Sequence, residues 1–170
     1  MAVFAGFLRA VNVGGTGKLK MEDLRALCGE VGFTDISTYI ASGNIVFRAD
    51  MEQSAAQAVL ETRLAEFTGN PASVDLRTPD ELQAIVSNSP FQDAPGNKVI
   101  VLLTPSQISA NFAETARHQT NEVISPGNRL VYIHYPDGQG RSKLTLPEMK
   151  TGTARNMNTI SKMLSLAQGV

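Results

Sequence analysis

The stretch Ile36-Ser37-Thr38-Tyr39-Ile40-Ala41-Ser42-Gly43-Asn44-Ile45-Val46-Phe47-Arg48 decides the fold. Residues 36–40 and 45–48 are predicted to form two strands around the segment from Ala41 to Asn44. Glycine and asparagine tolerate positive φ, so Ser-Gly-Asn is typical of a tight connection. The pattern predicts a β-hairpin within the first half of the chain.

The elements around this hairpin complete a βαββαβ order, which is the ferredoxin-like pattern. Apolar residues at spacings of three and four predict a helix over residues 21–31, ended by Gly32, with Cys28 buried on its apolar stripe. Residues 11–18 are a predicted loop, and residues 2–8 and 73–77 are predicted strands. A second helix, residues 51–67, is expected to face the core with Ala55, Val59, Leu60, Leu64 and Phe67.

The second half is predicted to vary the same theme. Thr78 and Pro79 are typical of a helix start, with Leu82, Ile85 and Val86 continuing the helix. The remaining predicted elements are a strand at 98–103, a helix from 104 to about 117, a hairpin of residues 122–124 and 129–134 around 125–128, a loop over 136–147, and a final helix over about 154–167, with Thr153 as a candidate cap and Ile160, Met163 and Leu164 inward. We therefore expect an α+β fold in which two ferredoxin-like (βαββαβ-type) subdomains, 1–77 and 78–170, are fused in one compact unit, 1–170, with a C-terminal helix.

Composition bounds the class of protein. The 170 residues are 42% hydrophobic and 18% charged, as in globular proteins, and wholesale disorder is excluded. A single cysteine, Cys28, excludes an intramolecular disulfide and a zinc site built on cysteines. The apolar start is too short for a signal peptide, and no run approaches a membrane span. We therefore expect a cytoplasmic protein with no membrane partner; its oligomeric state stays open.

Charge is distributed unevenly along the chain. Residues 49–125 hold ten acidic and four basic side chains, a net of −6, whereas residues 126–170 hold six basic and two acidic, a net of +4. The basic third is either a solvated face or an anion-binding surface. The overall charge of −1 argues against a generally basic nucleic-acid coat.

Three polar segments are candidates for binding because folding does not require them. The first is residues 9–18, a glycine-rich connection between a strand and a helix that lacks the P-loop pattern. The second is the turn Ser42-Gly43-Asn44, and the third is residues 153–159. In the third, Arg155, Asn156 and Asn158 offer donors suited to a phosphate, a carboxylate or a base edge. The alternatives are a flexible connection, an ordinary hairpin turn and a helix cap, respectively.

Catalytic motifs are absent from the sequence. The two histidines, His118 and His134, have no nearby nucleophile motif, and no cluster has metal-ligand spacing. Catalytic residues are therefore unknown, enzymatic turnover is unsupported, and we expect no metal and no cofactor.

Four ordered blocks, residues 7–27, 38–47, 140–144 and 153–159, resemble the bacterial domain-of-unknown-function 1697 family. The chain departs from the family pattern at Ala10, where the family has glycine, and at Met157, where it has tryptophan. The resemblance implies two ferredoxin-like subdomains and no particular activity. It marks the residues Arg9, Asn12, Gly14, Gly15, Ser42, Gly43, Asn44, Lys143, Arg155, Asn156 and Asn158.

These residues lead to one hypothesis and two alternatives. The hypothesis is that they converge on a cleft between the subdomains that binds a small anionic or polar ligand, with Arg9, Lys143 and Arg155 supplying charge and the asparagines supplying directional hydrogen bonds. The first alternative is nucleic-acid binding through the basic C-terminal third. The second is a purely structural role, in which the polar groups satisfy backbone atoms.

Overall fold

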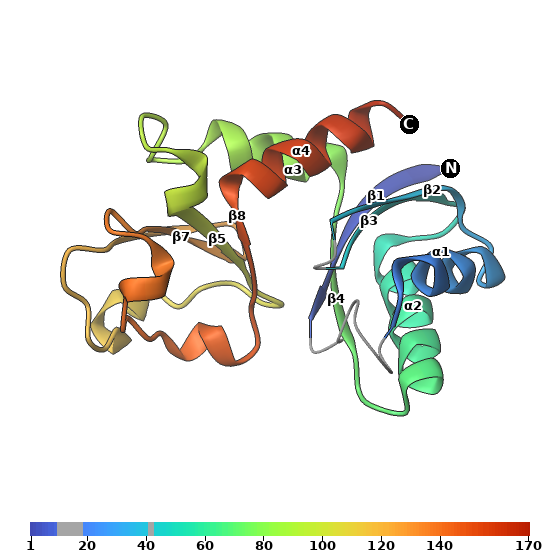
Figure 1. Cartoon of the computed structure of the whole chain (residues 1–170), viewed down its shortest axis with the longest axis horizontal. Helices are drawn as coiled ribbons and strands as arrows, with labels where there is room; N and C mark the ends of the chain where they lie inside the picture. The colour runs from blue at the N-terminus through green and yellow to red at the C-terminus, as the bar shows by residue number, and fades with distance from the viewer. Residues whose placement is uncertain (10–18, 41–42) are drawn as a thin grey trace. The chain divides into compact units, whose positions relative to one another are not determined.

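The structure, a computed structural model, describes residues 1–9, 19–40 and 43–170 (Figure 1). Within these residues there are four α-helices and two four-stranded antiparallel sheets, which confirms the α+β class and the C-terminal helix. The chain divides into two compact units. Unit 1 contains Met1–Leu82 and Met163–Val170, and unit 2 contains Gln83–Lys162.

Unit 1 holds the first sheet, whose strand order is β2-β3-β1-β4 with antiparallel neighbours throughout. This is the ferredoxin-like order, so the βαββαβ prediction for the first half is confirmed. Figure 1 shows both helices of the pattern on the same side of this sheet. The elements are β1 (Ala2–Arg9), α1 (Met21–Glu30), β2 (Thr34–Tyr39), β3 (Asn44–Ala49), α2 (Gln53–Thr68) and β4 (Ser73–Arg77).

The core of unit 1 lies between the first sheet and these helices. Alternate strand residues such as Phe4, Leu8 and Phe47 face α1 and α2, and the Phe33 and Phe47 rings stack with centroids 4.1 Å apart. Cys28 is buried there as expected, and burial raises the pKa of its thiol to about 12.

The predicted inner face of α2 is partly wrong. Leu60 and Leu64 are buried, but Ala55, Val59 and Phe67 are exposed, and Ala56 takes the third inward position. Residues 56, 60 and 64 are four apart and form one stripe along the helix. Apolar side chains occur all around α2, so the sequence does not fix which stripe meets the sheet.

Unit 2 holds the second sheet, with strand order β6-β7-β5-β8. This order repeats that of the first sheet, strand for strand. The start predicted for α3 (Pro79–Ser87) is confirmed, because the Thr78 hydroxyl accepts a hydrogen bond from the Glu81 amide at 3.1 Å and the Glu81 carboxylate accepts one from the Thr78 amide at 3.0 Å. The other elements are β5 (Val99–Leu103), β6 (Val123–Gly127), β7 (Leu130–His134), β8 (Thr153–Asn156) and α4 (Met157–Gln168). The first residues of α3 and the last residues of α4 belong to unit 1, because unit 2 runs from Gln83 to Lys162.

The helix predicted from residue 104 to about 117 is wrong. Only a 3-10 turn, Phe112–Thr115, forms there, and the rest is irregular. The Thr104 amide donates to the Arg129 carbonyl at 2.9 Å, and Gln107 Nε2 donates to Asn128 Oδ1 at 2.6 Å. The start of the segment is thus tied to the β6–β7 turn, and the hydrogen bonds within the segment close only short turns, such as that from the Phe112 amide to the Ser109 carbonyl.

Two further boundaries differ from the predictions. Residues 153–156, expected to lead into the last helix, form β8 and pair with β5, so α4 begins at Met157. The hairpin turn is also shorter than expected, because β6 runs on to Gly127 and pairs Pro126 with Val131. Only Asn128 and Arg129 remain in the turn, with Arg129 at a φ of 56°.

Candidate functional site

The described residues of two of the three polar segments, Arg9 in the first and Gly43 and Asn44 in the second, lie at one end of the first sheet. Phe7 pairs with Asn44 across β1 and β3, and the Leu8 amide donates to the Gly43 carbonyl at 2.9 Å. Arg9, the last residue of β1, pairs with Ser73 at the start of β4. We call this place the loop end of the first sheet: Arg9, Tyr39, Gly43, Asn44 and Ser73.

The turn at the loop end is fixed by its own residues. Gly43 has a φ of 82°, a conformation that side chains disfavour, which accounts for glycine there. Asn44 is fully buried, and its Nδ2 donates to the Tyr39 carbonyl at 3.0 Å. Asn44 therefore closes the turn by satisfying a backbone group, as the structural alternative expects of an asparagine. Arg9 is partly exposed and carries the positive charge of the loop end.

Four predicted site residues, Asn12, Gly14, Gly15 and Ser42, lie outside the described residues. By sequence, the first three follow Arg9 and the fourth precedes Gly43.

Sequence reasoning missed a buried ion pair on β4. The Arg77 guanidinium, 1% exposed, donates from Nε to Asp75 Oδ1 at 2.6 Å and from Nη2 to Oδ2 at 3.3 Å. Asp75 pairs with Phe7 and Arg77 with Ala5, so both lie on the same face of the sheet as Arg9. The sequence contained a pattern that indicates this pair: Asp75 and Arg77 alternate with the apolar Val74 and Leu76 in a predicted strand, so the two charged side chains share one face.

In unit 2, Arg155, Asn156 and Asn158 gather where β8 becomes α4. Asn156 Oδ1 accepts a hydrogen bond from the Thr159 amide at 2.9 Å, so Asn156, not Thr153, caps α4. The Asn158 side chain lies against the backbone of Gly96, where a Cβ would clash with it. Both asparagines thus have structural contacts, and Arg155, which pairs with Val101 on β5, is the partly exposed cation of this group.

Replacing Asn156 by alanine should destabilise the protein by about 1 kcal/mol, because the first turn of α4 loses its cap. Urea unfolding monitored by circular dichroism measures this loss. Asn156→Asp keeps the acceptor and should retain most of the stability; an equal loss in both variants would contradict the capping role.

The structure does not bring Lys143 to Arg155. Leu144, next to Lys143, packs on the face of the second sheet that carries Ile100 and Leu102. Arg155 pairs with Val101, whose side chain points to the opposite face. The two cations therefore lie over different faces of one sheet.

A second feature that the sequence did not reveal is a buried carboxylate in unit 2. Glu122 Oε2 accepts from Ser142 Oγ at 2.5 Å, and Oε1 accepts from the Thr120 amide at 2.6 Å and hydroxyl at 3.2 Å. These hydrogen bonds, that of Ser142 foremost, lower the pKa of Glu122 to about 2. Burial raises the pKa of the Tyr135 phenol, and the Glu122 charge raises it further. We call this arrangement the Glu122 clasp: Glu122, Thr120 and Ser142.

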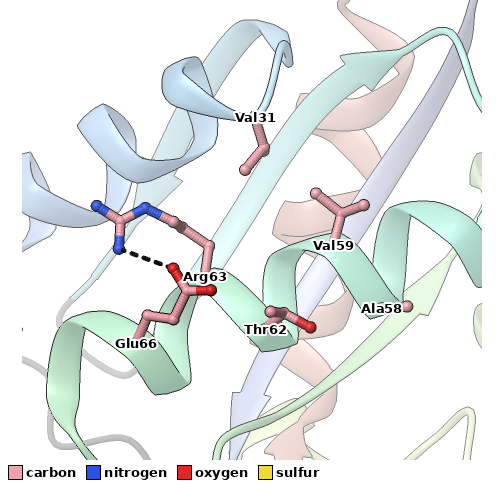
Figure 2. A pocket seen from close by; sticks show the side chains of 6 residues that line it. All are labelled: Val31, Ala58, Val59, Thr62, Arg63 and Glu66. Carbon is pink, nitrogen blue, oxygen red and sulfur yellow. Dashed lines mark ion pairs between the residues drawn. The ribbon is translucent and has the colours of Figure 1, made fainter.

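A shallow groove lies on the helical side of unit 1, with a volume of about 360 Å³ (Figure 2). Val31, Ala58, Val59 and Thr62 line it together with an Arg63–Glu66 ion pair at 3.9 Å. Arg63 also contacts Glu30 at 2.8 Å. Its charge is therefore already neutralised, and the groove offers no free cation to an anion.

The described residues contain no group of three or more histidine, cysteine, aspartate or glutamate side chains that could hold a metal ion. No helix in the described part of the chain has the length and apolar character needed to span a membrane.

Together, the two sheets define an α+β protein with a repeated ferredoxin-like strand order. The model of the family described as "Protein of unknown function (DUF1697)" matches residues 1–132, and the chain belongs to this family. A solved structure of the conserved bacterial protein SP0830 from Streptococcus pneumoniae is similar in fold, with a TM-score of 0.79 and 22% identity over 99% of each chain. No curated protein matches the sequence.

Proposed function

We propose that this protein binds a small anionic or polar ligand at the loop end of the first sheet. The observation that carries the proposal is the Leu8–Gly43 hydrogen bond, which puts Arg9 and the turn before Asn44 side by side. Arg9 and Gly43, 34 residues apart in the chain, thus lie at the same end of the sheet. Arg9 supplies the charge, and its guanidinium suits a phosphate or a carboxylate.

The remaining predicted residues take different parts in this proposal. Asn44 holds the turn through the Tyr39 carbonyl and so shapes the site without contacting the ligand. The glycines of the segment after Arg9 suit it for backbone amide donors to an oxyanion. Arg155 is proposed as a further contact to the ligand. The Arg155→Ala variant tests whether Arg155 belongs to the same site as Arg9.

The test is calorimetric titration of the protein with inorganic phosphate and with pyrophosphate. Loss of one charge-assisted hydrogen bond costs about 1.5–3 kcal/mol, so Arg9→Ala should weaken binding roughly ten- to hundredfold. Arg25→Ala is the matched control, because Arg25 is an exposed arginine of the same unit that bonds to the Thr38 hydroxyl. It should leave the affinity unchanged.

Thermal unfolding separates binding from folding. Arg9→Ala should melt near the wild-type temperature while losing the ligand. An unchanged phosphate affinity in Arg9→Ala, or an equal loss in Arg25→Ala, would refute the proposed site. If Arg155→Ala also weakens binding, and does so independently of a change in melting temperature, Arg155 belongs to it.

A further inference from the structure

Unit 2 carries a row of exposed cations on the connection between β7 and β8. Burial alternates along residues 141–146, with every second side chain directed inward. Ser142 has extended backbone angles, φ −82° and ψ 142°, and an extended chain sends successive side chains to opposite sides. The outward residues are Arg141, Lys143 and Thr145, and the inward residues are Ser142, Leu144 and Leu146.

A third cation joins the row from the connection between β5 and β6. Arg117 and Thr145 form an antiparallel bridge, with both amide-to-carbonyl distances at 2.9 Å. Residues directly opposite each other in such a pair project to the same side. The exposed Arg117 therefore stands beside the outward side chains of the 141–146 segment. We call Arg117, Arg141 and Lys143 the basic strip.

In the described part of the chain, no acidic side chain forms an ion pair with the basic strip. Among the described residues, Arg141 and Lys143 take part in no ion pair or side-chain hydrogen bond, and the Arg117 guanidinium donates only from Nη1, to the carbonyls of Glu114 and Ala116. Within that same part of the chain, the Glu114 carboxylate makes no ion pair with the strip.

The Glu122 clasp fixes the backbone that presents these cations. Ser142 Oγ donates to the Glu122 carboxylate and accepts from the Leu144 amide at 3.1 Å, so the residues on both sides of Lys143 are held. The Glu122 charge faces the inner side of the segment, where three donors surround it. The strip is therefore positioned before any partner arrives, which lowers the entropy cost of binding.

We propose that the basic strip binds the phosphate backbone of single-stranded nucleic acid. Small ligands occupy concave sites, whereas these side chains stand on an exposed extended segment and match a linear polyanion. Two of the three cations are arginines, whose planar guanidinium groups bind phosphates bidentately. The strip contains no aromatic side chain on which a base could stack, so its contacts go to phosphates and carry no sequence preference. This site is distinct from the loop end of the first sheet.

The test is fluorescence anisotropy with a labelled oligothymidylate, titrated over a range of salt concentrations. Three phosphate contacts to a single strand predict that log K falls against log salt with a slope of about −2, and each cation removed should make the slope shallower by about 0.7. Arg117→Gln, Arg141→Gln and Lys143→Gln are the single variants, and the triple variant should lose binding. The side chains are exposed, and matching circular dichroism melts should confirm that every variant folds.

Controls separate this proposal from general charge effects and from the loop-end site. Arg25→Gln removes one positive charge from unit 1 and should leave the affinity and the salt slope unchanged. A salt-independent affinity, an equal loss in Arg25→Gln, or equal binding of polyglutamate and oligothymidylate would overturn the proposal. Loss of phosphate titration in Arg9→Ala with retained oligonucleotide binding would support two separate sites.

Discussion

Asp75→Asn should destabilise the protein by about 3–5 kcal/mol, because it removes the Asp75 charge that faces the buried Arg77 guanidinium. Arg77 is 1% exposed and Asp75 10%, and both carboxylate oxygens accept from the guanidinium. Asparagine has the shape of aspartate but no charge. Urea unfolding at neutral pH measures the change.

A more exposed ion pair supplies the control for this substitution. Arg48 and Asp35 lie 3.4 Å apart with side chains 33% and 62% exposed, and exposed pairs contribute less than about 1 kcal/mol. Asp35→Asn should therefore cost little, and asparagine suits the φ of 50° at that position. Equal losses in the two variants would show that burial of the Asp75–Arg77 pair is not what matters. Replacing both partners, as Asp75→Leu with Arg77→Met, should recover much of the loss, since no unpaired charge remains.

Glu122→Gln should remove an acid-sensitive contribution to the stability of unit 2. The pKa of Glu122 is about 2 in the folded protein and 4.5 ordinarily, so between these values the unfolded chain binds more protons. The stabilisation is complete above about pH 4.5 and is lost as the pH falls toward 2. Glutamine has only one acceptor oxygen, and its NH₂ group is a donor. At neutral pH this NH₂ group would face a Thr120 or Ser142 donor to which the carboxylate oxygen is bonded.

Thermal unfolding of the wild type and of Glu122→Gln between pH 7 and pH 2 measures this contribution. The variant should melt lower at pH 7, and the difference from the wild type should shrink below pH 4.5. Glu114→Gln is the control, because Glu114 is an exposed glutamate, and it should follow the wild-type profile. A constant difference between wild type and Glu122→Gln across this range would contradict an ionised clasp. Amide exchange at Leu144 should be faster in Glu122→Gln, since Ser142 Oγ loses its anchor.

The sequence by itself determined the architecture of the first half. The turn at Gly43, the stripe of α1 and the strand that became β4 are set by neighbours in the chain, so local patterns were enough to place them. The sequence of α2 alone did not determine which face of the helix packs against the sheet. Its apolar residues surround the helix, and contact with the sheet selected Ala56, Leu60 and Leu64.

The tertiary structure alone decided the second half and the chemistry of the surface. Residues 104–117 form no α-helix, because Thr104 and Gln107 bond to Arg129 and Asn128 at one end of the segment and Arg117 pairs with Thr145 at the other. Residues 153–156 form a strand because they pair with the edge of β5. The Glu122–Ser142 contact joins residues 20 apart, and the Arg117–Thr145 bridge likewise joins two separate connections. The sequence supplied the charged and polar side chains. Backbone pairing between distant segments determined which of them are in contact, and local sequence patterns do not predict such long-range pairing.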